Sequence, residues 1–144
     1  MPAASSTRAV AELLRQVDRI VFCFDGDNAG RKAAWRALEN SLEALADNKR
    51  LGFIFLPQED DPDSYIREFG KDAFARYVSE ATPLSRFLIE AAREGCDLNT
   101  AEGRAHMASN AKPLWMQLPD GALKRQLLTE IADLAEVHGV NVHM

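Results

Sequence analysis

Short apolar segments alternate with amphipathic segments in the first half of the chain. Residues 6–17 carry apolar side chains at helical spacing, and residues 19–24 (RIVFCF) form a continuous β-branched and aromatic run typical of a buried parallel strand. A second amphipathic segment spans about 29–47, and residues 51–56 (LGFIFL) repeat the strand pattern before Pro57 ends it. This order predicts two parallel strands connected by a helix and preceded by another helix.

Helical patterns alone follow the second strand. We expect a short helix with Asp63 as its N-cap and Gly70 at its end, and a further helix over 71–80. Beyond Pro83 the apolar spacing predicts no further strand. It predicts three helices, over residues 83–94, 100–117 and 120–138.

The predicted fold class is α/β, a partial Rossmann-like parallel sheet followed by a small all-helical subdomain. We place the α/β part at residues 1–81 and the helical subdomain at 82–144. The helices after Pro83 should pack as a separate cluster on the α/β part, and Cys23 should be buried in its strand. The apolar helical positions expected to be buried are Leu84, Phe87, Leu88, Leu114, Leu118, Leu123, Leu127 and Leu134.

Composition excludes several classes of protein. Hydrophobic residues make up 47% of the 144 residues, enough for a packed core, and the net charge of −5 argues against non-specific DNA coating through phosphate contacts. An enzyme that meets phosphates through a carboxylate-held metal is not excluded. The two cysteines form no C-x-x-C pair, which argues against a zinc ribbon. No secretory signal or run of ~20 apolar residues is present, so we expect a cytoplasmic chain with no membrane partner.

The first candidate site follows the first strand. Asp25 and Asp27 lie at its carboxyl end, where ligands of open α/β sheets bind, and Gly26 allows a turn that presents both acids to one ion. Carboxylate oxygens suit Mg²⁺. Arg31 and Lys32 follow in the first turns of the next helix, where cations oppose the helix dipole unless a phosphate compensates them. The structural alternative is a solvated turn in which Asp27 or Asn28 is only a helix cap.

The second candidate site follows the second strand. An acidic run from Glu59 to Asp63 includes Asp61 and Asp63, separated by Pro62. If the two strands are parallel neighbours, Asp61 and Asp63 should share one acidic pocket with the first acid pair. Mutual repulsion should then raise the pKa of some of these carboxyl groups in the absence of metal. The structural alternative is an exposed acidic turn that caps a helix.

Two other functions fit the same residues less well. Haloacid dehalogenase-like phosphatases also carry Asp-x-Asp after an apolar strand, with the first acid as nucleophile, which would be Asp25 here. They usually continue with Gly-Thr or Gly-Val, whereas this chain has Asn28-Ala29. The other alternative is a non-catalytic domain that only binds a metal or a partner.

The motifs resemble those of a known family. Residues 22–39 (FCFDGDNAGRKAAWRALE) closely resemble the Asp-x-Asp segment of the Toprim domain of bacterial replicative DNA primases. Residues 56–74 resemble the second acidic segment of that domain, and residues 83–90 resemble the start of the helical subdomain that follows it. The resemblance extends over roughly 12–137.

This resemblance implies an activity and a set of site residues. Bacterial primases are DNA-directed RNA polymerases that make short RNA primers from nucleoside triphosphates on single-stranded DNA, for the replicative helicase and polymerase. Their Toprim acids hold Mg²⁺ or Mn²⁺ for nucleotidyl transfer. By this resemblance, Asp25 and Asp27 are catalytic metal ligands. Asp61 and Asp63 are further metal ligands, and Arg31 and Lys32 are hypothetical phosphate contacts.

Parts of the family pattern are not found in this sequence. The family's Toprim domain opens with a strand ending in Glu, within a Glu-Gly-Tyr-Met-Asp stretch, and nothing here matches it. The amino-terminal zinc-binding domain, the basic subdomain and the helicase-binding domain are also expected to be absent. We therefore interpret the chain as a truncated, monomeric piece of the primase catalytic core. We expect it to make no primers by itself.

Overall fold

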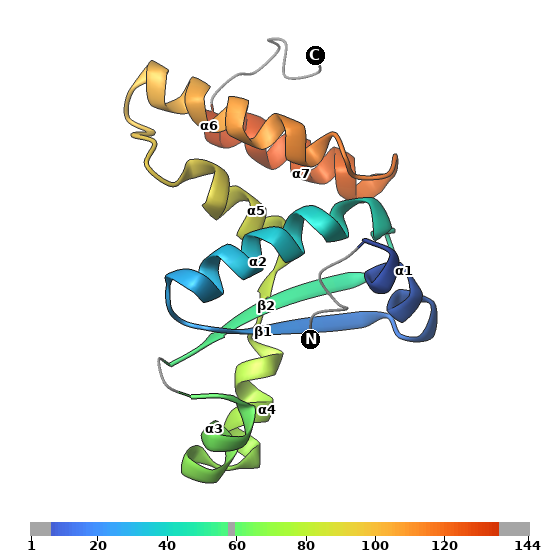
Figure 1. The fold of residues 1–144 in the computed structure, drawn as a ribbon. Coiled ribbons are helices and arrows are strands. Elements are labelled where there is room, and N and C mark those ends of the chain that lie inside the picture. Colours follow the sequence, from blue (N-terminus) through green and yellow to red (C-terminus); the bar gives the residue numbers. More distant parts are fainter. Residues whose placement is uncertain (1–6, 58–59, 136–144) are drawn as a thin grey trace.

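The structure is a computed structural model that describes residues 7–57 and 60–135. A mixed three-stranded sheet lies at the centre, with helices above and below it (Figure 1). Glu59 and the ends of the helices predicted over 6–17 and 120–138 lie outside the described residues. The elements are, in chain order, α1 (Thr7–Gln16), β1 (Arg19–Asp25), α2 (Asn28–Ser41), the 3-10 turn η2 (Leu42–Ala44), β2 (Arg50–Leu56), α3 (Pro62–Phe69), α4 (Lys71–Ser79), β3 (Thr82–Pro83), α5 (Leu84–Arg93), α6 (Ala101–Trp115) and α7 (Ala122–Ala135).

The two predicted strands pair in parallel, as expected. Their register runs from Arg19 opposite Arg50 to Asp25 opposite Leu56, so all seven residues of each strand are paired. The two-residue strand β3 adds to the other side of β2 in the antiparallel direction, which leaves β1 at the edge of the sheet. The sequence pattern missed β3 because two residues are too few to show a period.

Phenylalanine side chains cover one face of the sheet. Phe22 and Phe53, which are paired across the strands, have ring centroids 5.4 Å apart, and Phe24 and Phe55 follow at 5.9 Å. Phe87 of α5 stacks on Phe53 at 4.6 Å. Aromatic pairs at such distances contribute about 0.5–1.5 kcal/mol beyond area burial. This cluster fixes α5 against the sheet.

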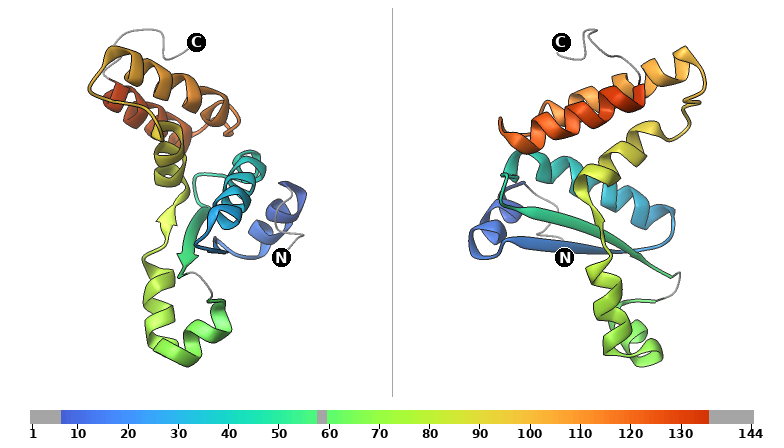
Figure 2. Two further views of the ribbon diagram at one scale, coloured as in Figure 1. Left: turned by 60° about the vertical axis from the view of Figure 1, so that its left-hand side comes forward. Right: turned by 180° about the vertical axis from the view of Figure 1, so that it is seen from behind.

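The helices form two groups on opposite sides of the sheet. α2 packs along β1, and α5, α6 and α7 lie above the sheet with α2, as Figures 1 and 2 show. α3 and α4 form a pair that extends below the sheet. No helix in the described part of the chain is long and apolar enough to cross a membrane.

The hydrophobic core is continuous between the α/β part and the later helices. Six of the eight expected helical positions are buried, and Leu123 and Leu134 are partly buried against them. The helices do not form the separate cluster that the sequence predicts, because Leu84, Phe87 and Leu88 of α5 belong to the same cluster as Phe22 and Phe53. The boundary near residue 81 stays a prediction.

Cys23 is exposed, so the prediction that it is buried is wrong. It points to the face of β1 opposite Phe22 and Phe24, since side chains alternate along a strand. On the same face of the central strand β2, Ile54 and Leu56 are buried. Cys23 differs because β1 is the edge strand.

The beginning of α3 also differs from the expectation. Asp61, and not Asp63, is its N-cap, and Asp61 forms a capping box with Ser64. Pro62 explains the shift, because proline favours the first helical position and the cap is then the residue before it. Gly70 ends α3 with a φ of 94°, as its predicted role requires.

A carboxylate far away in sequence caps α7. The backbone N–H groups of Ala122 and Leu123 donate to the two oxygens of Asp47 at 3.1 and 3.0 Å. These bonds lower the pKa of Asp47, because they favour its charged form. Gly121 permits the approach, since a Cβ there would lie 2.9 Å from Asp47 Oδ1. The loop before β2 is therefore tied to the start of the last helix.

Removing the side chain of Asp47 should test this tie. Asp47→Ala should lower the melting temperature at pH 7, because two N–H groups of α7 lose their acceptor. Because the pKa of Asp47 is lower in the folded than in the unfolded protein, its carboxylate stabilises the fold at pH values above the unfolded pKa of about 3.9. This stabilisation is lost as the pH falls through the folded-state pKa. The difference in melting temperature between Asp47→Ala and wild type should therefore become smaller below pH 4. Asp120→Ala, which removes a fully exposed carboxylate beside α7, is the control. An equal loss in both variants would contradict the assignment.

Because the core is continuous, truncating a leucine should reduce the free energy of unfolding much more when that leucine is buried than when it is exposed. Leu88→Ala should lower the free energy of unfolding by about 2–5 kcal/mol, because Leu88 has no exposed surface. Leu13→Ala removes the same atoms from a side chain that is 38% exposed and should cost much less. Urea denaturation followed by circular dichroism measures both, and similar losses would count against the observed packing.

Candidate metal centre

The turn between β1 and α2 folds tightly over the ends of the two parallel strands. A Cβ at Gly26 would lie 2.6 Å from the carbonyl oxygen of Leu56, and one at Gly30 would lie 1.8 Å from that of Asp25. Real Cβ atoms do not approach backbone oxygens so closely, so both positions require glycine. The Asp25–Gly30 segment is therefore held in one conformation at the carboxyl edge of the sheet.

This turn presents the first acid pair. Asp25 is exposed at the end of β1, and Asp27 is half-buried at the N-cap of α2. Asp27 Oδ1 accepts a hydrogen bond from the N–H of Gly30 at 2.7 Å. Asp27 is thus a helix cap, as the structural alternative stated, and it has a second carboxylate oxygen for another ligand.

The second acid set is organised by α3. Asp61 Oδ1 accepts from the N–H of Ser64 at 2.8 Å, and the Ser64 hydroxyl donates to Asp60 at 2.8 Å. The backbone bond from Ser64 lowers the pKa of Asp61. Asp61 is therefore not one of the carboxyl groups whose pKa mutual repulsion raises. Asp63 is exposed in the first turn of the helix.

The two acid sets share an edge of the sheet but do not form one closed cluster. Asp25 and Leu56 are opposite each other at the carboxyl ends of the parallel strands, as expected. However, within residues 7–57 and 60–135 no three His, Cys, Asp or Glu side chains are close enough to hold a metal ion together. α2 begins directly over this edge, whereas α3 lies below the sheet (Figure 1). The single four-acid pocket predicted from the sequence is not present in this arrangement.

The donor chemistry nevertheless fits a divalent cation. Asp25 and Asp27 are hard oxygen ligands two residues apart on a fixed turn. Mg²⁺ is commonly bound by one or two carboxylates, with water and substrate phosphates completing its shell. An acid pair without a closed protein cage is therefore suited to a hydrated ion that a phosphate also contacts.

The two predicted phosphate contacts lie in different surroundings. The Arg31 guanidinium carbon is 4.1 Å from the centroid of the Phe55 ring, a cation–π contact that fixes the cation near the carboxyl end of β2. The Tyr77 hydroxyl donates to the backbone carbonyl of the same Phe55, and burial raises the Tyr77 pKa. Lys32 is exposed. Tyr77 was not a candidate from the sequence, because its partner lies 22 residues away.

A groove between α2 and α5 adjoins this edge. It has a volume of about 830 Å³, and Arg31, Lys32 and Trp35 line one side while Phe87 and Glu90 line the other. Trp35 is half-buried in the wall of this groove and packs against the hydrophobic core. Sequence periodicity could not reveal the groove, because two helices separated by more than 40 residues form it.

Comparisons with known proteins give a consistent identification. A sequence model described as Toprim-like matches residues 2–66, and one described as the DnaB-helicase binding domain of primase matches residues 85–138. The second match overturns the expectation that the helicase-binding domain would be absent. None of the matches supports the phosphatase alternative.

The similar proteins are primases. The DNA primase of Neisseria meningitidis serogroup A is 46% identical over 140 residues, which cover 96% of this chain and 24% of that protein. A crystal structure of a DNA primase domain from Pseudomonas aeruginosa is 40% identical with a TM-score of 0.90, over 96% of this chain and 43% of that one. A structure of the DnaG primase catalytic domain bound to ssDNA is 38% identical with a TM-score of 0.86, over 91% of this chain and 41% of that one.

The chain thus spans about a quarter of the length of the curated relatives it matches. The domain matches follow one another in the order in which the sheet and the later helices occur here. The sequence relatives and the solved structures agree with them, and this chain belongs to the bacterial DNA primase family.

Proposed function

We propose that this chain supplies the metal-binding edge of a primase catalytic core, which joins ribonucleotides into primers on a DNA template. The observation that carries the proposal is the Asp25-Gly26-Asp27 turn, which glycine contacts hold over the carboxyl ends of two parallel strands. The second acid set leaves the same edge of the sheet, and the family match supports this chemistry.

The residues have distinct roles in this proposal. Asp25 and Asp27 would hold Mg²⁺ or Mn²⁺, and Asp61 and Asp63, at the start of α3, would be further ligands. When bound, the ion neutralises triphosphate charge and activates the attacking hydroxyl for nucleotidyl transfer. Arg31, fixed on the Phe55 ring, compensates phosphate charge from the α2 side. Lys32 does the same as a mobile point charge.

The helix-capping hydrogen bonds favour metal binding by two of the carboxylates. Asp27 is held by Gly30, and Asp61 by Ser64, so neither carboxylate loses much conformational freedom when it binds an ion. In Asp61 the same bond keeps the carboxyl group ionised to lower pH. Ionised and fixed carboxylates are the form in which a hard cation binds.

The partners follow from the relatives. A related catalytic domain has been solved with ssDNA, which supports single-stranded DNA as the template of the whole protein, with nucleoside triphosphates as substrates. The match over residues 85–138 supports the replicative helicase as a partner of α5–α7. We assign residues 1–81 to the Toprim part and 82–144 to the helical part. A role in replication places the protein in the bacterial cytoplasm, and we expect a monomer.

Metal binding tests the proposal. Mn²⁺ should raise the melting temperature of the chain, by the linkage of about 2.7 kcal/mol that applies when the ion is at 100 times its Kd. Asp25→Asn/Asp27→Asn should lose this shift, because both charged ligands are gone. Asparagine keeps an acceptor for the N–H of Gly30, so the variant should fold as well as wild type without metal.

The control is Asp72→Asn, which removes an exposed acid from the first turn of α4. It should keep the full response to Mn²⁺. An unchanged response in the Asp25→Asn/Asp27→Asn variant would refute the metal site. A metal site with no contribution to primer synthesis, tested by the same substitutions in a full-length relative, would favour the non-catalytic alternative.

A further inference from the structure

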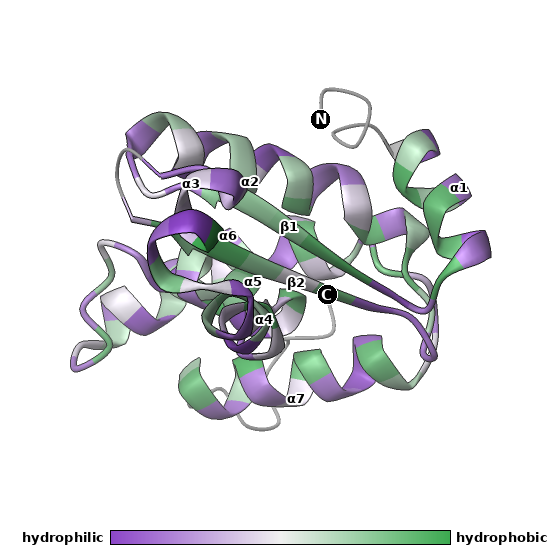
Figure 3. Cartoon of the chain, turned by 90° about the horizontal axis from the view of Figure 1, so that it is seen from below, coloured by the Kyte–Doolittle hydropathy of each residue, from purple (hydrophilic) through white to green (hydrophobic). Residues whose placement is uncertain are grey.

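A basic pocket lies at the amino edge of the sheet, opposite the acids. It has a volume of about 370 Å³. Arg19 and Arg50, the first residues of β1 and β2, line it together with Lys49. In Figure 3 the strands are hydrophobic along their middle and hydrophilic at these ends. No carboxylate is among the described residues that line the pocket, although acidic residues outnumber basic ones by 22 to 17 in the chain.

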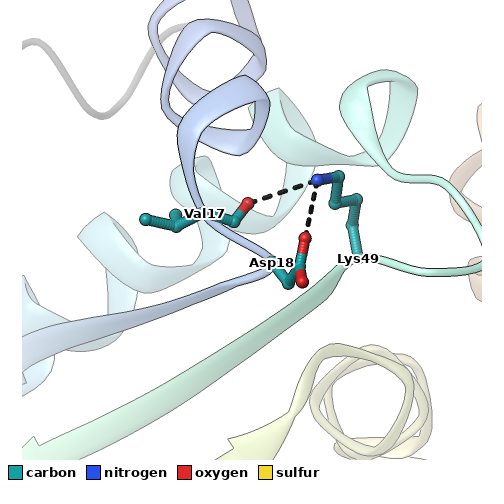
Figure 4. Close-up of polar contacts among 3 residues, drawn as sticks. All are labelled: Val17, Asp18 and Lys49. Carbon is teal, nitrogen blue, oxygen red and sulfur yellow. Dashed lines mark hydrogen bonds and ion pairs between the residues drawn. The ribbon is translucent and has the colours of Figure 1, made fainter.

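Two of the three cations in the pocket have no carboxylate partner. The Lys49 ammonium forms an ion pair with Asp18 at 3.0 Å and donates to the Val17 carbonyl at 3.4 Å (Figure 4). Arg19 donates to the Val78 carbonyl at 3.0 Å, which anchors its guanidinium without neutralising it. Neither Arg19 nor Arg50 forms an ion pair with any residue of the described structure.

The parallel register places these two arginines opposite each other in the sheet. Arg19 and Arg50 are the first pair of the β1–β2 ladder, and neighbouring strands lie only about 4.8 Å apart. Like charges directly opposite each other destabilise a sheet. An anion between the two guanidinium groups would remove this repulsion, and guanidinium groups match phosphate oxygens in geometry.

The other walls suit a phosphate ester. Ser79 and Ser85 are among the lining residues, and the Ser79 hydroxyl donates to the Arg76 carbonyl at 2.7 Å. Leu51, Leu84 and Leu123 add apolar residues to the lining. The volume falls within the range of about 300–1,000 Å³ that is usual for small-molecule sites. The pocket therefore offers charge for a phosphate and apolar surface for the group that carries it.

We propose that this pocket binds a phosphate group carried on a nucleotide, either free or within a nucleic-acid strand. The site is separate from the proposed metal centre, because seven-residue strands place their two ends roughly 20 Å apart. Phosphates held here are therefore not those held by the metal. The binding involves no covalent step.

Binding measured in EDTA isolates this pocket from the metal centre. The 144-residue chain is titrated at low salt with pyrophosphate, with AMP and with a fluorescein-labelled single-stranded oligothymidylate, by calorimetry and fluorescence anisotropy. Arg50→Gln should weaken binding roughly tenfold or more, because a charge-assisted hydrogen bond is lost. Ser85→Asp should abolish binding, since it places a carboxylate in the pocket.

The matched control is Arg86→Gln on α5, which makes the same charge change at an exposed residue outside the pocket. It should leave binding nearly unchanged, and circular dichroism should show all variants folded. A response of AMP to Arg50→Gln identifies a free nucleotide, and a response of the oligonucleotide without AMP identifies a strand. A response of pyrophosphate alone identifies a bare phosphate anion and would overturn the nucleotide assignment. No binding of any probe, or equal effects of Arg50→Gln and Arg86→Gln, would overturn the proposal.

Discussion

The in-register parallel pairing of β1 and β2 is the constraint on which the rest of the structure depends. Because the strands have equal length and begin together, side chains of the same kind meet across the ladder: phenylalanines in the middle and arginines at the amino ends. The phenylalanines form the surface on which α5 packs. The two strand ends become two edges of opposite charge, and each edge carries one of the proposed sites.

The α/β part and the later helices depend on each other for stability. Phe87 stacks on Phe53, β3 pairs with β2, and Asp47 caps α7. These contacts join segments that are far apart in sequence. Packing of the shared core must therefore offset the entropy that is lost when the intervening loops close. This dependence explains why the helices that match a separate domain description do not have a core of their own here.

The carboxyl edge combines structural and chemical roles in the same residues. Asp27 and Asp61 each cap a helix, and each is also a proposed metal ligand. A carboxylate that caps a helix is already fixed in place, which lowers the cost of holding a cation. At Asp61 the capping bond also lowers the pKa of the carboxyl group. The structural and functional interpretations of the Asp-x-Asp turn are therefore compatible, since one oxygen of Asp27 serves the helix and the other can serve a ligand.

The sequence by itself determined the two long strands β1 and β2, the helices except for their ends, and the edge of the sheet at which Asp25 and Asp27 lie. Those features follow from local periodicity and from proline and glycine positions, which act over a few residues. Only the tertiary structure decided that Cys23 is exposed on an edge strand and that the two acid sets remain apart. It also decided that Arg31 lies over Phe55. The strand register sets Arg19 opposite Arg50, in a pocket whose described lining residues include no carboxylate. Each of these features depends on which segment, distant in sequence, packs against the residue, and local sequence patterns do not determine such contacts.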